Sequence, residues 1–249
     1  MKQHIGFLRA LILPALWLPL VAFAGLKEDM VALDRAYIPA LAVTTEGKLP
    51  ESQRAMEQLN KQWAAFKQQN ATIKGGDTQW KSDIAAIDRM IAEANKVVAG
   101  GVDLVKAHEA LEGVRMTMLA MRARSRMSYY LDALTHFHDP MEDIVLAAKD
   151  KTPETFGEAD LAKIRAALPL AEKRWAEVKA MRVDPAFMLS AEQQQTLTGL
   201  IASESAALDT LKKALAGSDR AALIKAAVAI KPAFARIYMS FGNFEPVRR

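Results

Sequence analysis

The side chains best suited to chemistry in this chain are its histidines, which cluster in one short stretch. Of the four histidines, only His4 lies outside residues 102–149. The others have carboxylates close by, in His-Glu-Ala-Leu-Glu (residues 108–112) and His-Phe-His-Asp-Pro-Met-Glu (residues 136–142). Imidazole and carboxylate groups together bind zinc, copper, iron or nickel, so this clustering favours a transition-metal site.

Two pairs in these segments have the spacing of a shared helical face. His108 precedes Glu112 by four positions, as His138 precedes Glu142, and side chains at this spacing lie on one side of a helix. If the chain reverses near Ser125, two antiparallel helices would place His108 opposite Glu142. The same reversal would place Glu112 opposite His138, and helical bundles hold metals with side chains that converge in this way. The predicted metal ligands are His108, Glu112, His136, His138 and Glu142.

Two alternatives to this shared site remain open from the sequence. No Gly or Pro marks a turn over residues 122–128. One continuous helix would hold His108 and His136 about 42 Å apart, at a rise of about 1.5 Å per residue. The segment Asp139–Glu142 has the order of an N-cap, a first-turn proline and an acidic residue. A new helix starting at Asp139 would place His138 and Glu142 on either side of a kink.

The elements that must position these side chains are helices. Ala, Leu, Lys, Glu, Gln, Arg and Met dominate the sequence, and no sustained apolar/polar alternation predicts strands. Breaks rich in glycine separate the helical segments at residues 47–50, 74–77, 99–101 and 216–218. We predict helices near residues 27–45, 51–70, 79–98, 102–123, 128–149, 158–182, 190–215 and 219–241.

The chain contains a degenerate duplication. Residues 59–67 (Leu-Asn-Lys-Gln-Trp-Ala-Ala-Phe-Lys) resemble residues 171–179 (Ala-Glu-Lys-Arg-Trp-Ala-Glu-Val-Lys), and an Ala-Gly break and a final helix follow in both copies. Trp63 and Trp175 stand at matching positions, where we expect them to anchor two cores. The last helix of the second copy should end at a position that matches about Met121 in the first copy. A chain reversal soon after Met121 is therefore favoured over one continuous helix.

The fold expected from these patterns is all-α, with two tandem up-down four-helix bundles over residues 25–125 and 126–249. Residues 1–24 have the features of an export signal: a basic start, an apolar run and small residues before the expected cleavage point. We therefore expect a periplasmic protein. No later segment approaches 18 uninterrupted apolar residues, so we expect no stable membrane span.

Charge and cysteine content exclude several classes of function. Loss of residues 1–24 leaves 31 of the 33 basic residues against 29 acidic ones. This near balance gives no reason to expect nucleic-acid binding. The chain has no cysteine, which excludes disulfides, thiolate zinc sites and haem attached through Cys-x-x-Cys-His.

Two segments carry a family resemblance: residues 24–33 (Ala-Gly-Leu-Lys-Glu-Asp-Met-Val-Ala-Leu) and the Ala- and Glu-rich residues 101–115. Over residues 25–125 the chain resembles the soluble b-type cytochromes of the periplasm, four-helix bundles that bind haem. The resemblance implies that Met30 corresponds to the methionine that ligates haem iron in that family. No histidine stands at the place of the family's axial histidine, and the nearby residues that offer a ligand atom are Met118 and Met121.

These observations predict a non-catalytic exported protein that binds copper, iron, zinc or haem b, for transport, storage, sensing or electron transfer. The chain has no nucleophile motif, phosphate loop or Glu-x-x-His pair, so we expect no enzyme. Methionines near the histidines favour copper, although core packing is the ordinary role of methionine. The alternative is a periplasmic interaction or chaperone-like module that binds a protein partner and no cofactor.

Overall fold

The computed structural model describes residues 21–70 and 78–248, and this part of the chain is helical with no strand. The prediction of an all-α fold is therefore confirmed. Most of the expected export signal, residues 1–20, lies outside the described residues. In chain order the main helices are α1 (Val21–Thr45), α2 (Leu49–Asn70), α3 (Thr78–Gly100), α4 (Leu104–Arg124), α5 (Tyr130–Ala148), α6 (Glu158–Ala180), α7 (Ala191–Ala216) and α8 (Arg220–Met239). The short helices η1 (Pro185–Phe187) and α9 (Glu245–Arg248) precede α7 and follow α8.

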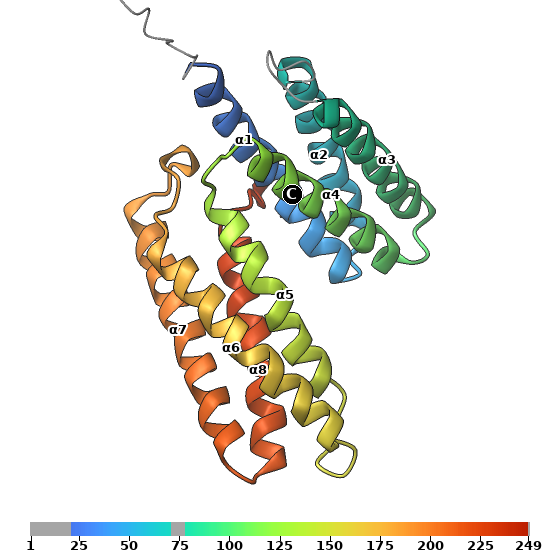
Figure 1. Cartoon of the computed structure of the whole chain (residues 1–249). Helices are drawn as coiled ribbons and strands as arrows, with labels where there is room; N and C mark the ends of the chain where they lie inside the picture. The colour runs from blue at the N-terminus through green and yellow to red at the C-terminus, as the bar shows by residue number, and fades with distance from the viewer. Residues whose placement is uncertain (1–20, 71–77, 249) are drawn as a thin grey trace, which may run out of the picture.

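These helices form two groups of four. In the first group, α1 packs on α2 and α4, and α3 packs on the same two helices, which closes a ring. Helices α5 to α8 close a second ring in the same order. Figure 1 shows the groups as two neighbouring bundles, with the break between α4 and α5 at residues 125–129. No helix in the described part is both long enough and apolar enough to cross a membrane.

The two matching tryptophans occupy equivalent places in the two bundles. Each lies on the second helix of its bundle, with only 4% of Trp63 and 3% of Trp175 exposed. The Trp63 indole N–H donates to Oδ1 of Asp88 on the third helix at 2.8 Å. The Trp175 indole N–H donates to Oγ of Ser205, also on a third helix, at 2.9 Å. The same helix-to-helix bond is therefore built twice with different acceptors.

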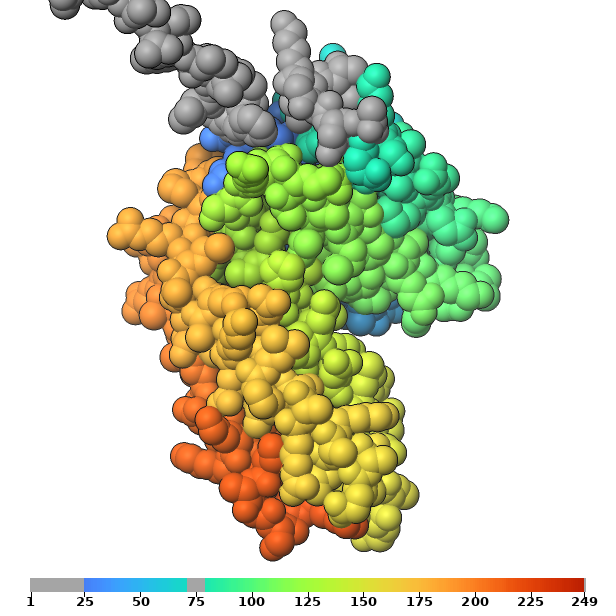
Figure 2. All heavy atoms as spheres, viewed as in Figure 1, coloured from blue at the N-terminus to red at the C-terminus, as the bar shows by residue number. Residues whose placement is uncertain are grey.

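The two bundles are in contact along α1, which packs on α8 and η1 of the second bundle. The chain also returns to the first bundle after α8, because α9 lies on α2. The backbone N–H of Asn243 donates to the carbonyl oxygen of Arg35 at 2.8 Å. Nε of Arg54 donates to the carbonyl oxygen of Val247 at 2.9 Å. In the space-filling view the bundles meet along a continuous surface (Figure 2).

One alternative and one expectation about the histidine region are wrong. No helix begins at Asp139, because α5 continues through Pro140. Pro140 and Met141 are both buried, and this packing holds the helix together where proline removes one backbone bond. Helices α4 and α5 also do not pack side by side as a hairpin. Each packs instead within its own bundle, α4 on α1 and α3, and α5 on α6 and α8.

Candidate functional site

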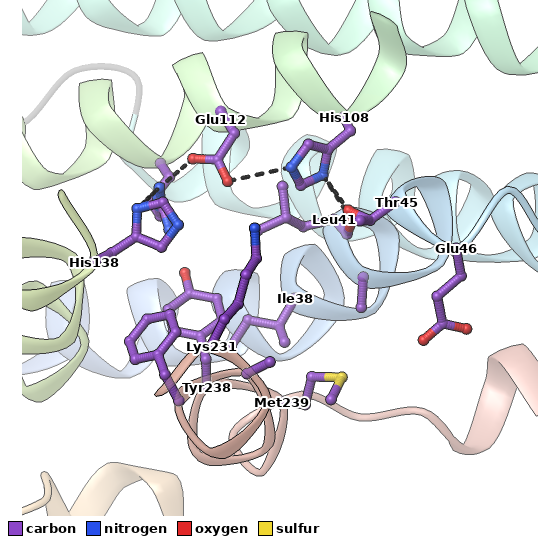
Figure 3. A pocket seen from close by; sticks show the side chains of 14 residues that line it. Ile38, Leu41, Thr45, Glu46, His108, Glu112, His138, Lys231, Tyr238 and Met239 are labelled. Carbon is purple, nitrogen blue, oxygen red and sulfur yellow. Dashed lines mark hydrogen bonds and ion pairs between the residues drawn. The ribbon is translucent and has the colours of Figure 1, made fainter. Parts of the chain in front are cut away.

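A pocket of about 200 Å³ lies where the two bundles meet, and both histidine segments reach it. Helices α1 and α4 of the first bundle line it together with α5 and α8 of the second. Its apolar side chains include Ile38, Leu41, Phe234, Tyr238 and Met239, and its polar ones include His108, Glu112, Arg115, His138 and Lys231 (Figure 3). Residues far apart in the sequence therefore converge at one site.

His108 connects α4 to the end of α1. Its Nδ1 lies 2.6 Å from Oγ1 of Thr45 and 3.1 Å from the carbonyl oxygen of Leu41. Because a carbonyl oxygen only accepts, Nδ1 carries the proton of this bond. The other ring nitrogen, Nε2, lies 3.5 Å from Oε1 of Glu112. His108 and Glu112 thus lie on one helical face, as the spacing predicts, and their contact is an ion pair when the imidazole is protonated.

Arg115 joins Glu112 to the histidine of the other bundle. Arg115 lies one turn after Glu112 on α4. Its Nη2 forms an ion pair with the Glu112 carboxylate and lies 3.2 Å from Nδ1 of His138. The arginine is 5% exposed, and its Nε has no hydrogen-bond partner among the described residues. Glu112 and His138 therefore meet through the guanidinium group of Arg115, which is not among the predicted ligands.

His138 is held in its neutral form. Burial lowers the pKa of the imidazole to about 3, and the nearby charges of Arg115 and Lys231 act in the same direction. Since a guanidinium group only donates, Nδ1 of His138 accepts the bond from Arg115 and the ring proton lies on Nε2. At neutral pH this side chain is an acceptor that holds Arg115 in place.

The remaining predicted ligands lie elsewhere on α5. Oε1 of Glu142 accepts a hydrogen bond from Nζ of Lys231 at 2.9 Å, and Glu142 does not line the pocket. Its buried Oε2 has no partner in the described part. His136 is exposed to solvent. The expected meeting of His108 with Glu142 is not formed, because α4 and α5 do not run side by side.

Arg115 contacts two of the predicted metal ligands. Within residues 21–70 and 78–248, no three or more His, Cys, Asp or Glu side chains are grouped so that they could hold a metal ion. The positive charge of Arg115 lies within bonding distance of both Glu112 and His138. A metal ion bound by these two residues would have to displace the guanidinium group. The metal site predicted from spacing therefore stays a prediction.

The two methionines implied as haem ligands lie inside the first bundle. Met30 is fully buried and Met118 is 1% exposed. The sulfur of Met30 lies 3.9 Å from Nη1 of Arg122, which is itself 2% exposed. A buried cation thus already occupies the space beside this thioether, which does not favour a haem iron there.

Comparison with known proteins adds no family to this geometry. Protein-family models, curated proteins and solved structures all gave no match to the chain. The resemblance to b-type cytochromes therefore stays a prediction.

A second polar cluster links the bundles and was not anticipated from the sequence. Nε and Nη2 of Arg122 donate to Oδ1 of Asp132 at 2.9 and 2.6 Å. Nη1 of Arg122 lies 3.7 Å from Oδ2 of Asp34, which also accepts a 2.6 Å bond from the Tyr129 hydroxyl. Burial raises the pKa of Asp34 to about 6, although Arg122 and Tyr129 oppose the rise. This cluster joins α1, α4 and the start of α5.

One signal in the sequence marks the arginines of both clusters. Arg115 and Arg122 follow His108 at seven-residue intervals, so all three lie near one face of α4. Because this face of α4 also carries buried apolar residues, the two arginines indicate charged side chains that are buried where α4 packs against other helices. The sequence contains no comparable signal for Lys231 or Tyr238, because their helix reaches the pocket only through tertiary packing.

Proposed function

We propose that the protein is an exported, non-catalytic binding protein that holds a small organic molecule in the pocket between its two bundles. The observation that carries this proposal is the composition of the pocket. Apolar side chains of α1 and α8 face a small set of fixed polar side chains from α4, α5 and α8. Pockets that bind small molecules typically have this combination of mostly apolar walls and a few placed polar groups.

The polar groups favour an organic ligand over a metal ion. Arg115 and Lys231 bring two positive charges to the pocket, and the imidazole of His138 is neutral because its pKa is about 3. The carboxylate of Glu112 is already paired with Arg115. A metal ion would therefore have to compete with Arg115 for the Glu112 carboxylate, whereas a neutral or anionic molecule would not.

The size of the pocket limits the ligand. A volume of about 200 Å³ equals that of roughly seven water molecules at ~30 Å³ each. It is smaller than the pockets of roughly 300–1,000 Å³ that hold drug-sized ligands. The ligand should therefore be a compact molecule, such as a single ring with a short substituent.

A variant that fills the pocket tests this proposal. Ala235 lines the pocket on α8, so Ala235→Phe should block it, whereas Ala206→Phe on the exposed face of α7 serves as the control. Water-soluble fragments with anionic, neutral and cationic members are screened against the mature protein by ligand-observed NMR. We expect at least one fragment to bind the native protein and the control but not Ala235→Phe. Equal binding by all three proteins, or no binding by any, would contradict the proposal.

A further inference from the structure

We infer that the ligand of this pocket is a small organic carboxylate whose anionic end is bound jointly by Arg115 of the first bundle and Lys231 of the second. This inference rests on the proposed function, since it names the chemical class that the same pocket selects. The apolar body of the ligand would lie against Ile38, Leu41 and Phe234, which line the pocket beside these charges.

The first observation is the unused donor capacity of Arg115. A guanidinium group has five N–H donors on three nitrogens. Nη2 makes both contacts that hold the side chain, to Glu112 and to His138. The buried Nε also lacks a partner in the part of the chain that the structure describes, but it is closed to solvent. The donor left for a ligand is therefore Nη1, which makes no hydrogen bond among the described residues. Arg115 is thus fixed in position with donors to spare, which is the state required of a residue that recognises a carboxylate.

The second observation is the position of Lys231. It extends from α8 toward the cluster formed by His108, Glu112 and His138 (Figure 3). Its Nζ donates one hydrogen bond, to Oε1 of Glu142 at 2.9 Å. An ammonium group has three donors, so Lys231 can bond to a ligand while it keeps this partner. The two cations approach the pocket from different bundles.

The third observation is that the carboxylates lining the pocket already have cationic partners. Glu112 pairs with Arg115, and Glu46 pairs with Lys48 at 2.6 Å. The pocket therefore offers spare donors but no carboxylate without a cation. This imbalance selects an acceptor-rich anionic group over an amine, because an ammonium ligand would bring further donors beside two positive charges.

The test compares three molecules with one carbon skeleton and different charges: 3-phenylpropionate, 3-phenylpropanamide and 3-phenylpropan-1-amine. Their affinities for the full mature protein are measured by isothermal titration calorimetry at low ionic strength. We expect the acid to bind roughly tenfold or more tightly than the amide, as for one charge-assisted bond, and the amine to bind most weakly.

Two variants test whether Lys231 causes the preference for the acid over the amide. Lys231→Met should reduce the ratio of acid to amide affinity toward one, because it removes one of the two cations at the pocket. Lys225→Met, on the exposed face of the same helix, should leave the ratio unchanged. Arg115→Gln should also remove the preference, but this residue is buried, so Lys231→Met is the primary test.

The outcomes separate this inference from the proposed function. A preference for the acid that is lost in Lys231→Met and kept in Lys225→Met would support it. Binding of the amide or amine as tightly as the acid would overturn the assignment of the ligand class and leave the pocket as a binding site. No binding by any of the three molecules would overturn the inference, and failure of the wider fragment screen would overturn the proposed function as well.

Discussion

Nη2 of Arg115 on α4 lies 3.2 Å from Nδ1 of His138 on α5, and this hydrogen bond joins the two bundles at the wall of the pocket. The bond requires a neutral imidazole, because a protonated ring has no acceptor. Through Arg115 it also connects His138 to Glu112, the pair that the spacing of the histidines placed opposite each other. The chemistry of the pocket therefore depends on how each partner is charged.

The first prediction concerns the stability contributed by His138. Its pKa is lowered from 6.5 to about 3 by burial, so below pH 6.5 the unfolded chain binds a proton that the folded protein does not. Acidification from pH 6.5 to pH 5 should therefore lower the free energy of unfolding by roughly 2 kcal/mol. In His138→Gln, which still offers Arg115 an acceptor, this contribution should be absent. Urea unfolding of both proteins at pH 5 and 7 measures the difference, and identical pH dependence would contradict the assignment.

The second prediction concerns Asp34, whose pKa is raised from 3.8 to about 6 by burial. The folded protein holds this proton more tightly than the unfolded chain does, so its contribution to stability is lost as pH rises from about 4 to 6. This loss amounts to a fall in the free energy of unfolding on the order of 3 kcal/mol, and Asp34→Asn should remove it. The amide still accepts from Tyr129, and Arg122 keeps its bonds to Asp132.

The control for Asp34 is the other carboxylate of the cluster. Asp132→Asn removes the main partner of Arg122, so we expect a loss of about 3–5 kcal/mol at pH 7. Asp34→Asn should be nearly neutral or stabilising at the same pH. Chemical unfolding of both variants at pH 4.5 and 7 distinguishes them. Equal destabilisation by the two changes would show that Asp34 is an ionised partner of Arg122.

The third prediction concerns Glu204, a fully buried carboxyl group on α7. Neither of its oxygens has a hydrogen-bond partner within the described residues. Burial raises its pKa from 4.5 to about 8, opposed by the nearby backbone N–H of Phe234. The folded state thus loses stability as pH rises from about 4.5 to 8. Glu204→Met should raise the free energy of unfolding by roughly 3 kcal/mol more at pH 8 than at pH 5. Glu192→Met, on the exposed part of α7, should show no such difference.

The fourth prediction concerns the point where the chain returns from α8 to the first bundle. A Cβ atom on Gly242 would lie 2.8 Å from Cε2 of Phe244 and 2.9 Å from Cγ2 of Ile38. Gly242→Ala should therefore destabilise the protein by about 1–3 kcal/mol, since the surrounding atoms are already close-packed. Gly199 lies inside α7 with no atom within 4 Å of its would-be Cβ. Gly199→Ala should stabilise by about 0.5–1 kcal/mol, and thermal unfolding tests whether the two changes have opposite signs.

The helices of this protein could be predicted because their ends are encoded by neighbouring residues. Ser190 accepts from the backbone N–H of Gln193 at 3.2 Å, and the Gln193 side chain accepts from the backbone N–H of Ser190 at 2.8 Å, a reciprocal cap that starts α7. Gly47 and Gly101 take positive φ angles of 69° and 68° just after α1 and α3. Such signals need no knowledge of the tertiary fold.

The site was predicted only in part, because periodicity shows which face of a helix is buried but not which partner covers it. His108 and His138, both predicted site residues, line one pocket. The hairpin geometry was wrong because α4 and α5 pack within separate bundles. The seven-residue spacing marks Arg115 as a charge on the buried face of α4, but its acceptor His138 on α5 is defined only by the docking of the two bundles.

The measurement that tests the central claim most directly is the imidazole ¹⁵N spectrum of the protein during titration. His108 and His138 line the pocket, whereas the exposed His136 lies outside it and serves as an internal reference. On addition of 3-phenylpropionate, the signals of His108 and His138 should shift together and saturate while that of His136 stays in place. Zinc should not reproduce this pattern. Saturating shifts of both pocket histidines with equimolar zinc, and none with the carboxylate, would contradict the account and restore the metal site.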